Sequence, residues 1–481
     1  MIARSTKPPR AVRLLLAFAV VAGGACSGSG GGPHAASTTT VPPTEPLTTT
    51  PRTVTRPTVT PPTLPSSPVV RVPATIDPTG RADVTKTLQA FLSSVPRGRE
   101  VVFRKGARYR VEGTLILRSR QQLTIEGNDA TVFATTRGGR DRAQWWFKRG
   151  RQIVIRDLVV RGANPNAGTS DSAYVPRLET QHGFRFEGVD GVELDNVQVY
   201  DVFGDFVYIG RGKDRIPSRN VWVHDSRFSR DGRQGISVVA ATNVIIERNR
   251  LDQTRRSTFD LEPDTRSERV SNIFILNNTI GKGRLLFLAA HGQGRVNNVV
   301  ISGNHLLGHS LSIDSLPPER SPRRKNWVVV DNTSDTPAVQ QRTMRFFRTD
   351  GLAIRGNRQL VAGDEPAVVL FDVCGAHVSG NEFGTSRIRQ VSARCNAPLT
   401  VPVPPAIMGR GKPRPGRSVV PTPTTASPPS TRVAPPTSTL APPAPSSSRG
   451  GLDLADWIFI ALGAGVVVGA AAFIIRARRR R

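Results

Sequence analysis

A short sequence pattern recurs seven times at nearly constant spacing between Val221 and Phe383. Each copy has an alternating apolar run that leads into an asparagine or serine, and in most copies another apolar residue follows two positions later. The marked positions are separated by 23, 29, 26, 28, 25 and 24 residues, and they are Ser226, Asn249, Asn278, Asn304, Asn332, Asn357 and Asn381. A repeat of this length is typical of a solenoid, in which each unit stacks on its neighbours.

Two kinds of solenoid have repeats of this length. Leucine-rich repeats share the aliphatic-x-aliphatic-x-x-Asn frame, so the asparagine does not separate the two. Here each unit continues into a second β-branched or aromatic strand, as in "GISVVA" from Gly235 and "AVVLFDV" from Ala367. The sequence therefore predicts an all-β fold, a parallel β-helix with two or three short strands per coil. We expect the asparagines at corners between strands, in left-handed backbone.

The N-terminal segment predicts export from the cytoplasm. Four basic residues precede the apolar run "LLLAFAVVAGGA", which has the length of a signal-peptide core and is too short to span a membrane. We expect residues 1–25 to be a signal peptide that is cleaved before Cys26. The motif "GGAC" also resembles a bacterial lipobox, so lipidation of Cys26 is the alternative. Residues 26–69 form a Pro/Thr/Ser-rich linker that has too little apolar content to fold.

The C-terminal segment predicts a membrane anchor. Residues 402–454 are a Pro-rich stalk, and residues 455–475 contain the uncharged run "WIFIALGAGVVVGAAAFII". That run has about the 20 residues that a bilayer core requires. The tail "RARRRR", residues 476–481, follows at once, and clustered arginines stay on the cytoplasmic side. We therefore expect a single-pass protein of the cell membrane whose β-helix lies outside the cytoplasm.

Both ends of the predicted β-helix, residues 70–401, carry features that close a stack of coils. The segment "DVTKTLQAFLSS" has apolar residues at helical spacing, and an amphipathic helix there would cover the open edge of the first coil. Near the other end, Cys374 and Cys395 lie 21 residues apart, which is about one coil. Because an exported domain meets an oxidising environment, we expect a disulfide between them.

The charge of the chain restricts its partners. A formal net charge of +29 favours anionic partners such as acidic polysaccharide, cell-wall polymers or nucleic acid. Nucleic acid is disfavoured because the chain carries export signals and only 6% aromatic residues, which are not interleaved with the basic ones. We expect a groove for a polyanion to be lined by arginines, and the candidates are Arg211, Arg215, Arg219, Arg320, Arg323 and Arg324.

Stacking the second strands by their apolar residues predicts one mixed cluster of charges. We align Ile236 and Val238 with Phe259 and Leu261, and these in turn with Leu286 and Leu288. The side chains between them then face outward, and adjacent strands lie about 4.8 Å apart. The expected catalytic residues are Asp260, Glu262, His291, Arg233 and Arg256. The expected substrate-binding residues are Asp231, Gln234, Asp205 and Asp314.

This cluster fits two kinds of polysaccharide chemistry. In a lyase or C5-epimerase acting on a uronate, Arg233 or Arg256 would neutralise the substrate carboxylate. His291, or a carboxylate of raised pKa, would remove the C5 proton. In a glycoside hydrolase, Asp260 and Glu262 would form the carboxyl pair. The alternative is a set of solvated ion pairs on a non-catalytic β-helix that binds glycan or mediates adhesion.

Residues 70–400 resemble the pectin-lyase-like right-handed parallel β-helix superfamily. The entry segment "GRADVTKTLQAFLSSVPRGREVVFRKGARYRVEGTLIL" carries the resemblance, with its helix, its strand and a turn from Gly106 to Tyr109. The resemblance implies a polysaccharide partner, because the members are pectate lyases, polygalacturonase-type hydrolases, uronate epimerases, adhesins and tailspikes.

The catalytic signatures of this superfamily are mostly absent. The motif "HGQG" at His291 lacks the first glycine of the hydrolase Gly-His-Gly, and "RIPSR" from Arg215 is one residue short of the lyase Arg-x-Pro-x-x-Arg. The resemblance therefore does not choose between an enzyme and a binding protein. No cofactor is predicted: related lyases hold Ca²⁺, but no loop motif supports such a site at Asp260 or Glu262, and no His/Cys metal spacing occurs.

Overall fold

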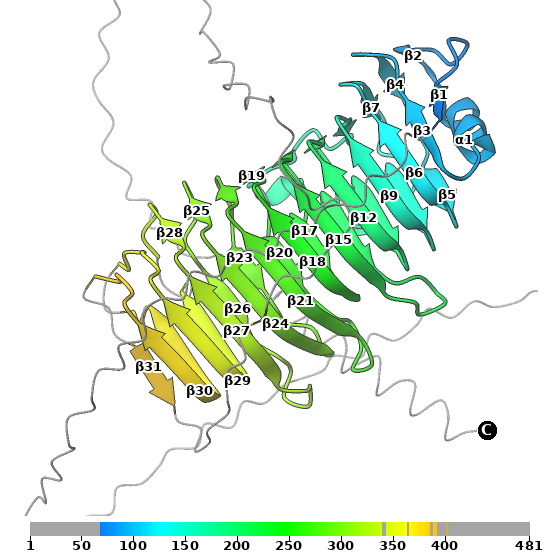
Figure 1. Ribbon diagram of the computed structural model, residues 1–481. Helices are drawn as coiled ribbons and strands as arrows, with labels where there is room; N and C mark the ends of the chain where they lie inside the picture. The colour runs from blue at the N-terminus through cyan, green and yellow to red at the C-terminus, as the bar shows by residue number, and fades with distance from the viewer. Residues whose placement is uncertain (1–67, 339–342, 363–364, 385–387, 392–401, 403–481) are drawn as a thin grey trace, which may run out of the picture. The chain divides into compact units, whose positions relative to one another are not determined.

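The computed structural model describes residues 68–338, 343–362, 365–384, 388–391 and 402. This part of the chain winds into a parallel β-helix whose coils follow one another from the first strand to the last (Figure 1). Each strand pairs in parallel with its counterpart one coil away. For example, β18 (Ala241–Glu247) lies between β15 (Ser218–His224) and β21 (Arg269–Leu276). The prediction of an all-β parallel solenoid is confirmed.

Two sheets run along the coils, one of 21 strands and one of ten. The larger sheet also contains β1 (Val69–Arg71), β3 (Arg99–Val102), β5 (Leu115–Arg118), β6 (Gln121–Glu126), β8 (Trp145–Lys148), β9 (Arg151–Arg156), β11 (Phe184–Glu187), β12 (Asp190–Asp195), β14 (Val207–Gly210), β17 (Ile236–Val238), β20 (Ser257–Leu261), β23 (Leu286–Ala289), β24 (Arg295–Ser302), β26 (Ile313–Ser315), β27 (Arg324–Val330), β29 (Met344–Arg355), β30 (Val368–Ser379) and β31 (Ile388–Val391). The smaller sheet contains β2 (Thr79–Asp83), β4 (Arg108–Arg110), β7 (Thr131–Phe133), β10 (Val159–Arg161), β13 (Gln198–Tyr200), β16 (Arg227–Ser229), β19 (Arg250–Asp252), β22 (Thr279–Ile280), β25 (His305–Leu306) and β28 (Thr333–Ser334).

Inward-facing side chains stack from coil to coil and form one continuous apolar core. Ile236 pairs with Phe259 as predicted, but Phe259 pairs with Leu288. The predicted partner of Phe259, Leu286, pairs instead with Ser257, so this part of the predicted alignment was wrong by two residues. Because side chains alternate between the two faces of a strand with a period of two, the outward positions are the same in both alignments.

The repeated asparagines form a buried ladder and do not occupy the left-handed corners that the sequence predicts. The positive φ belongs to the residue before each one, as at Asn277, whose φ is 52°. The amide nitrogen of Asn278 donates to the Ile246 carbonyl (3.0 Å) and to Oδ1 of Asn304 (3.0 Å). Its own Oδ1 accepts from the backbone N–H of Asn249 (3.0 Å). The side chains thus satisfy buried backbone groups at the corner that strand pairing leaves without partners.

A helix, α1 (Thr85–Ser94), lies between β2 and β3 in the chain, at the N-terminal end of the stacked coils (Figure 1). Its Leu88 and Leu92 are buried in the core, which agrees with the helical spacing read from the sequence. Gln89 lies on the same helix and bonds the backbone of Ile116 in β5. It accepts from the N–H (2.6 Å) and donates to the carbonyl (2.9 Å). The helix therefore packs on and hydrogen-bonds to one of the first coils.

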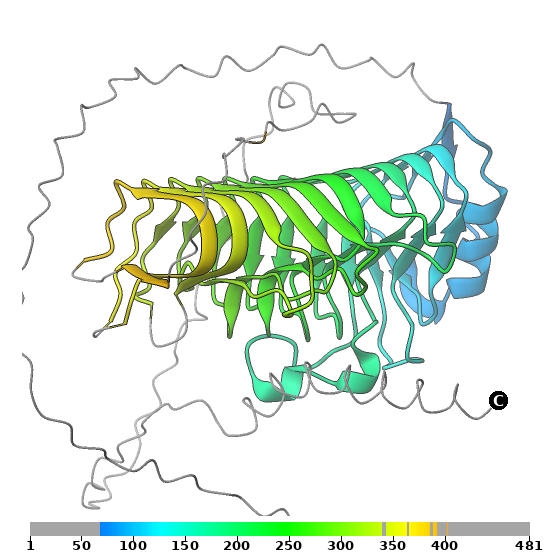
Figure 2. The same cartoon turned by 90° about the horizontal axis from the view of Figure 1, so that it is seen from below.

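A long loop leaves the coil between β10 and β11. We call residues 162–183 the η loop, because it contains the 3-10 helices η1 (Asp171–Ala173) and η2 (Pro176–Leu178). The two short helices project from the side of the stacked strands (Figure 2). The Asp171 carboxylate pairs with Arg255 and Arg284, each at 2.7 Å, and both arginines belong to later coils. The η loop therefore runs alongside coils that follow it in the sequence.

Several predictions fall wholly or mostly outside the described residues, namely the signal peptide, the linker, the stalk, the membrane segment and the basic tail. In the part of the chain that the structure describes, no helix is both long and apolar enough to cross a membrane. Cys374 is buried in β30, but Cys395 lies outside the described residues. The disulfide between them stays a prediction.

Candidate functional site

The predicted cluster lies along the strands that stack through β14, β17, β20, β23 and β26. Ser237, Asp260, Ala289 and Asp314 occupy equivalent outward positions on four consecutive coils. Asp205 comes shortly before β14, and Arg233 and Gln234 come shortly before β17. Glu262 directly follows β20. Stacking therefore places in one row of coils residues that are up to 109 positions apart in the sequence, counted from Asp205 to Asp314.

Arg233 is the cation around which the acidic side chains gather. Its Nη1 lies 3.1 and 3.2 Å from the two carboxylate oxygens of Asp205, which is fully buried. Its Nε lies 3.6 Å from Glu179 and its Nη2 lies 3.9 Å from Glu262. Burial disfavours the charged guanidinium, but the surrounding carboxylates, Asp205 foremost, raise the pKa of Arg233 above its ordinary value. This arginine is therefore already neutralised within the protein and is a poor choice for binding a substrate carboxylate.

Asp260 and Glu262 share a face of the chain and contact each other. Asp260 is 2% exposed, and it accepts a hydrogen bond from the side-chain amide of Gln234 (3.1 Å). Burial, followed by the charge of Glu262, raises the pKa of Asp260 well above its ordinary value, and the two side chains are hydrogen-bonded. The side chain of Glu262 is 38% exposed. Within the pair, the buried member therefore binds a proton more readily than an ordinary carboxyl group, and the other member faces solvent.

Gln234 fixes the geometry of both buried carboxyl groups. Its backbone N–H donates to Asp205 (3.2 Å), and its side-chain oxygen accepts from the N–H of Ser257 (2.8 Å). Burial also raises the pKa of Asp205, although Arg233 opposes this shift. The sequence predicts that Gln234 and Asp205 bind substrate, but both side chains are buried. They are placed to position the exposed groups.

The η loop supplies residues that sequence reasoning missed. The Tyr174 hydroxyl donates to Glu179 (2.8 Å), and burial together with this contact raises the pKa of Tyr174 to about 12. The guanidinium of Arg256 lies 5.7 Å from the centre of the Tyr174 ring. No ion pair within the described ranges involves Arg256, so its charge is available to a ligand. The only sequence signal for this loop is its length, because it interrupts the regular coil.

His291 and Asp314 lie further along the same row of coils. The His291 side chain is 39% exposed, and its Nε2 lies 3.9 Å from a carboxylate oxygen of Asp314. The Nε2 atom itself is buried, and its burial lowers the pKa of His291 below the ordinary value of 6.5, with Asp314 and Glu262 opposing the shift. Asp314 is buried and accepts from the Arg345 guanidinium (2.6 Å). His291 is therefore neutral at neutral pH and can accept a proton.

Asp231 does not lie in the outward cluster that the sequence predicts. It is fully buried, and its Oδ1 accepts from the backbone N–H of Arg255 (2.7 Å). Burial raises its pKa well above the ordinary value. Asp231 lies beside the turn before β17, and its role there is structural. Of the nine predicted site residues, those with side chains at least partly open to solvent are Glu262, His291, Arg233 and Arg256.

A different set of side chains has the donor types of a metal site. Glu193, Asp195 and His224 place one ligand atom each within 4.8 Å of one another in the described part of the chain. His224 already contacts Asp225 (2.7 Å) and Glu193 (3.3 Å) through its two ring nitrogens. These contacts account for both nitrogens without an ion. Asp260 and Glu262, where no loop motif supports a Ca²⁺ site, do not belong to this group.

The fold and site define a right-handed β-helix protein with a polar, acid-rich cluster on one outer face. Residues 177–340 match the family model described as "Right handed beta helix region". The resemblance to the pectin-lyase-like β-helix superfamily is thereby confirmed at the level of fold. No curated protein matches the sequence.

Several solved structures share the architecture. The surface adhesin PfbA of Streptococcus pneumoniae is 13% identical, with a TM-score of 0.44 over 65% of this chain and 90% of the adhesin. An alginate lyase from Paenibacillus sp. is 13% identical, with a TM-score of 0.40 over 65% and 97%. An endo-xylogalacturonan hydrolase from Aspergillus tubingensis is 13% identical, with a TM-score of 0.47 over 71% and 100%. Likeness at this level concerns the fold.

Proposed function

We propose that this chain is an enzyme that acts on an acidic, uronate-type polysaccharide by proton transfer at C5, as a lyase or an epimerase. One observation carries the proposal. The Asp260–Glu262 pair, in which the pKa of Asp260 is raised, lies on the same face as Arg256, which has no ion pair in the described residues, and as His291, whose pKa is lowered. A uronate needs these three functions, which are a cation for its carboxylate, a base and an acid.

Each exposed group has a place in the reaction. Arg256 would neutralise the substrate carboxylate and so make the C5 proton more acidic. His291, held neutral, would take that proton. In a lyase the C4–C5 double bond then forms as the C4–O4 bond breaks, and the departing oxygen takes a proton from the Asp260–Glu262 pair. In an epimerase the pair would return a proton to C5 from the opposite side, with no bond to O4 broken.

Hydrolysis fits the geometry less well. Glycoside hydrolases use two carboxyl groups that are separated by about 5 to 9.5 Å, so that a sugar or a water fits between them. Asp260 and Glu262 hydrogen-bond to each other and therefore act as one acidic unit. Asp205 is not a substitute, because it is fully buried against Arg233.

The second candidate is a glycan-binding or adhesive β-helix without catalysis. The specific observation in its favour is Arg233, whose charge is taken up by Asp205, Glu179 and Glu262. Such a network also has a purely structural use, since it joins the η loop to the stacked coils. Under this alternative the same face would hold a glycan, and no bond would change.

We also propose that the β-helix works outside the cytoplasm and is tethered to the cell membrane. Support comes from the sequence at both ends, that is, the apolar run before Cys26 and the uncharged run before the terminal arginines. The Pro-rich stalk between the β-helix and the second run would let the domain reach polymers of the cell wall.

The test uses the purified full-length protein and a panel of polyuronates. A lyase produces a C4–C5 double bond, which is followed by its ultraviolet absorbance. An epimerase exchanges the C5 proton with deuterated solvent without shortening the chain. Asp260→Asn and His291→Ala should abolish either signal, and His305→Ala, an exposed histidine on β25, should leave it intact. If the wild type binds polyuronate but gives neither signal, the binding protein is the correct reading. New reducing ends without a double bond would show hydrolysis and contradict our proposal.

A further inference from the structure

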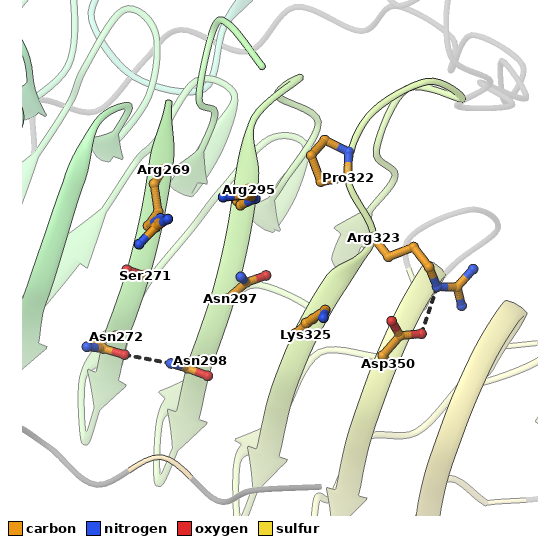
Figure 3. Close-up of a pocket in the computed structure, with 10 residues that line it drawn as sticks. All are labelled: Arg269, Ser271, Asn272, Arg295, Asn297, Asn298, Pro322, Arg323, Lys325 and Asp350. Carbon is orange, nitrogen blue, oxygen red and sulfur yellow. Dashed lines mark hydrogen bonds and ion pairs between the residues drawn. The ribbon is translucent and has the colours of Figure 1, made fainter. Parts of the chain in front are cut away.

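A second polar site lies on a different strand of each coil, away from the Asp260–Glu262 pair. A pocket of about 670 Å³ is formed over β21, β24 and β27 (Figure 3). Four of its lining residues are cationic, namely Arg269, Arg295, Arg323 and Lys325, and one, Asp350, is acidic. Within one coil, β20 carries Asp260, and β21 follows it after a turn that begins at Glu262.

The cations of this pocket are arranged by the coil repeat. Arg269 pairs in register with Arg295 on the next coil, and Asn297 pairs with Lys325 on the coil after that. Adjacent coils are about 4.8 Å apart. This distance is close to the advance per sugar of an extended polysaccharide chain. A linear polymer lying across the coils would therefore meet a positive side chain at each step.

Most of this positive charge is not neutralised by the protein. Arg323 is paired with Asp350 (2.7 Å) and Asp372 (2.5 Å). Arg269, Arg295 and Lys325 are exposed, and within the described ranges they take part in no ion pair. Like charges on adjacent strands repel each other, so the arrangement costs stability unless an anion bridges them. The row is thus complementary to a repeated negative charge.

The remaining wall of the pocket offers amides instead of rings. Asn272 and Asn298 are linked side chain to side chain (2.8 Å), as Figure 3 shows, and both have positive φ, which fixes their direction. The Oδ1 of Asn297 is buried and accepts no hydrogen bond from the described residues. Amide groups suit hydroxyl groups of a sugar. No aromatic side chain lines the pocket, so it offers no surface on which nucleic acid bases would stack.

Other arginines that the sequence suggested for a polyanion groove do not belong here. Arg324 is fully buried and donates to the carbonyls of Gly292 (2.7 Å) and Ala290 (3.2 Å). Burial lowers its pKa to about 10. Arg211 is paired with Glu268. Among the six predicted groove arginines, Arg323 is the one that lines this pocket.

From this register, charge and lining we infer that the face of β21, β24 and β27 binds a linear anionic glycan along the axis of the coils. The ligand class is a polysaccharide with one acidic group at nearly every sugar. This binding requires no reaction at Asp260, so it would hold in an enzyme and in a binding protein alike. Its effect would be to keep a long polymer on the β-helix while other segments of it reach the acid-rich face.

The test measures binding of labelled oligogalacturonate to the full-length protein in the Asp260→Asn background, where no turnover interferes. Arg269→Gln combined with Arg295→Gln should weaken binding about tenfold, and added salt should weaken the binding of the parent protein more than that of the double variant. The matched control is Arg227→Gln with Arg250→Gln, two arginines that also pair across adjacent coils, on β16 and β19. It should change the affinity less than about twofold.

The Arg269/Arg295 double variant should melt at the temperature of the parent protein, because both side chains are exposed and lie outside the core. Equal affinities of the two double variants would overturn the proposal. So would a single-stranded DNA oligomer that binds as tightly as the glycan and loses affinity equally in the Arg269/Arg295 variant, because the face would then recognise charge alone. If no polyuronate of the panel is turned over but binding is retained and depends on Arg269, the proposed reaction is wrong and the proposed binding site is still supported.

Discussion

Replacing Asp260 with asparagine tests the proton that the site is built to hold. Asp260 is buried, and burial together with Glu262 raises its pKa well above the ordinary value of 3.8. Between the unfolded and the folded pKa, the folded protein binds more protons than the unfolded chain. The contribution of this group to stability is therefore lost as pH rises through that interval. For one proton the slope is about 1.4 kcal/mol per pH unit.

The asparagine removes this titration and keeps the contacts. Its oxygen can still accept from Gln234, and its amide can donate to Glu262 in place of the carboxyl proton. Relative to the wild type, the variant should therefore gain about 1.4 kcal/mol of unfolding free energy for each pH unit above the unfolded pKa, until the folded pKa is reached. Urea unfolding of the full-length protein, followed by tryptophan fluorescence from about pH 4 to about pH 8, measures this difference.

The same change at Asp314 is the matched control. Asp314 is also buried, but it accepts from the Arg345 guanidinium (2.6 Å). Asp314→Asn loses charge-assisted hydrogen bonds and should cost about 2 kcal/mol in urea unfolding. If Asp260→Asn is destabilised by a constant amount at every pH, then Asp260 is ionised in the folded protein. The shared proton on which the proposed chemistry depends would then be absent.

Three further outcomes follow from the structure. Asn278→Ala leaves the Asn249 N–H and the Ile246 carbonyl without their side-chain partner, and it should lower the free energy of unfolding in urea by about 3 kcal/mol. The control is Asn272→Gly on the outer ladder, which should cost under about 1 kcal/mol because its φ of 57° suits glycine. The pKa of His291 is lowered, so the acid limb of a kcat/KM profile on polyuronate should lie below its ordinary value of 6.5, and a limb above that value would remove His291 as the base. Arg256→Gln should lower kcat/KM on polyuronate by at least about tenfold, and an unchanged value would show that this arginine does not meet the substrate.

The fold was predictable because it depends on a period that is written directly in the sequence. A strand that alternates in polarity and recurs about every 25 residues can bury its inward face only by stacking on its own copies. The details of the corner were not predictable in the same way. Asparagine is common in left-handed backbone, so the pattern suggested that role. The structure instead gives the positive φ to the preceding residue, as at Arg248 and Asn277, and the asparagine side chain bonds the backbone of the preceding coil.

The site was predictable only as far as the strand register reaches. The alternation of β20 placed Asp260 and Glu262 together, and the stacking rule brought Arg233 and His291 near them. The sequence did not show how deeply each side chain is buried. Asp260 is buried although it faces outward from β20, and the pattern of a strand carries no information about what covers its outer face. The contribution of Glu179 and Tyr174 was invisible for the same reason, since a loop leaving one coil can lie beside any of several later coils.

The distribution of charge over the β-helix connects the two proposed sites. The chain is strongly basic, yet the face around Asp260 is rich in carboxylates, and Arg233 is already neutralised there. A polyanion that approached this face alone would meet net repulsion, with Arg256 as the available cation. A cationic row on β21, β24 and β27 supplies the attraction that the acid-rich face lacks. If this division of roles is correct, long polyuronates should be processed much better than short ones at low salt, and the advantage should shrink as ionic strength rises, because screening weakens the distant contacts and leaves the local acid–base groups unchanged.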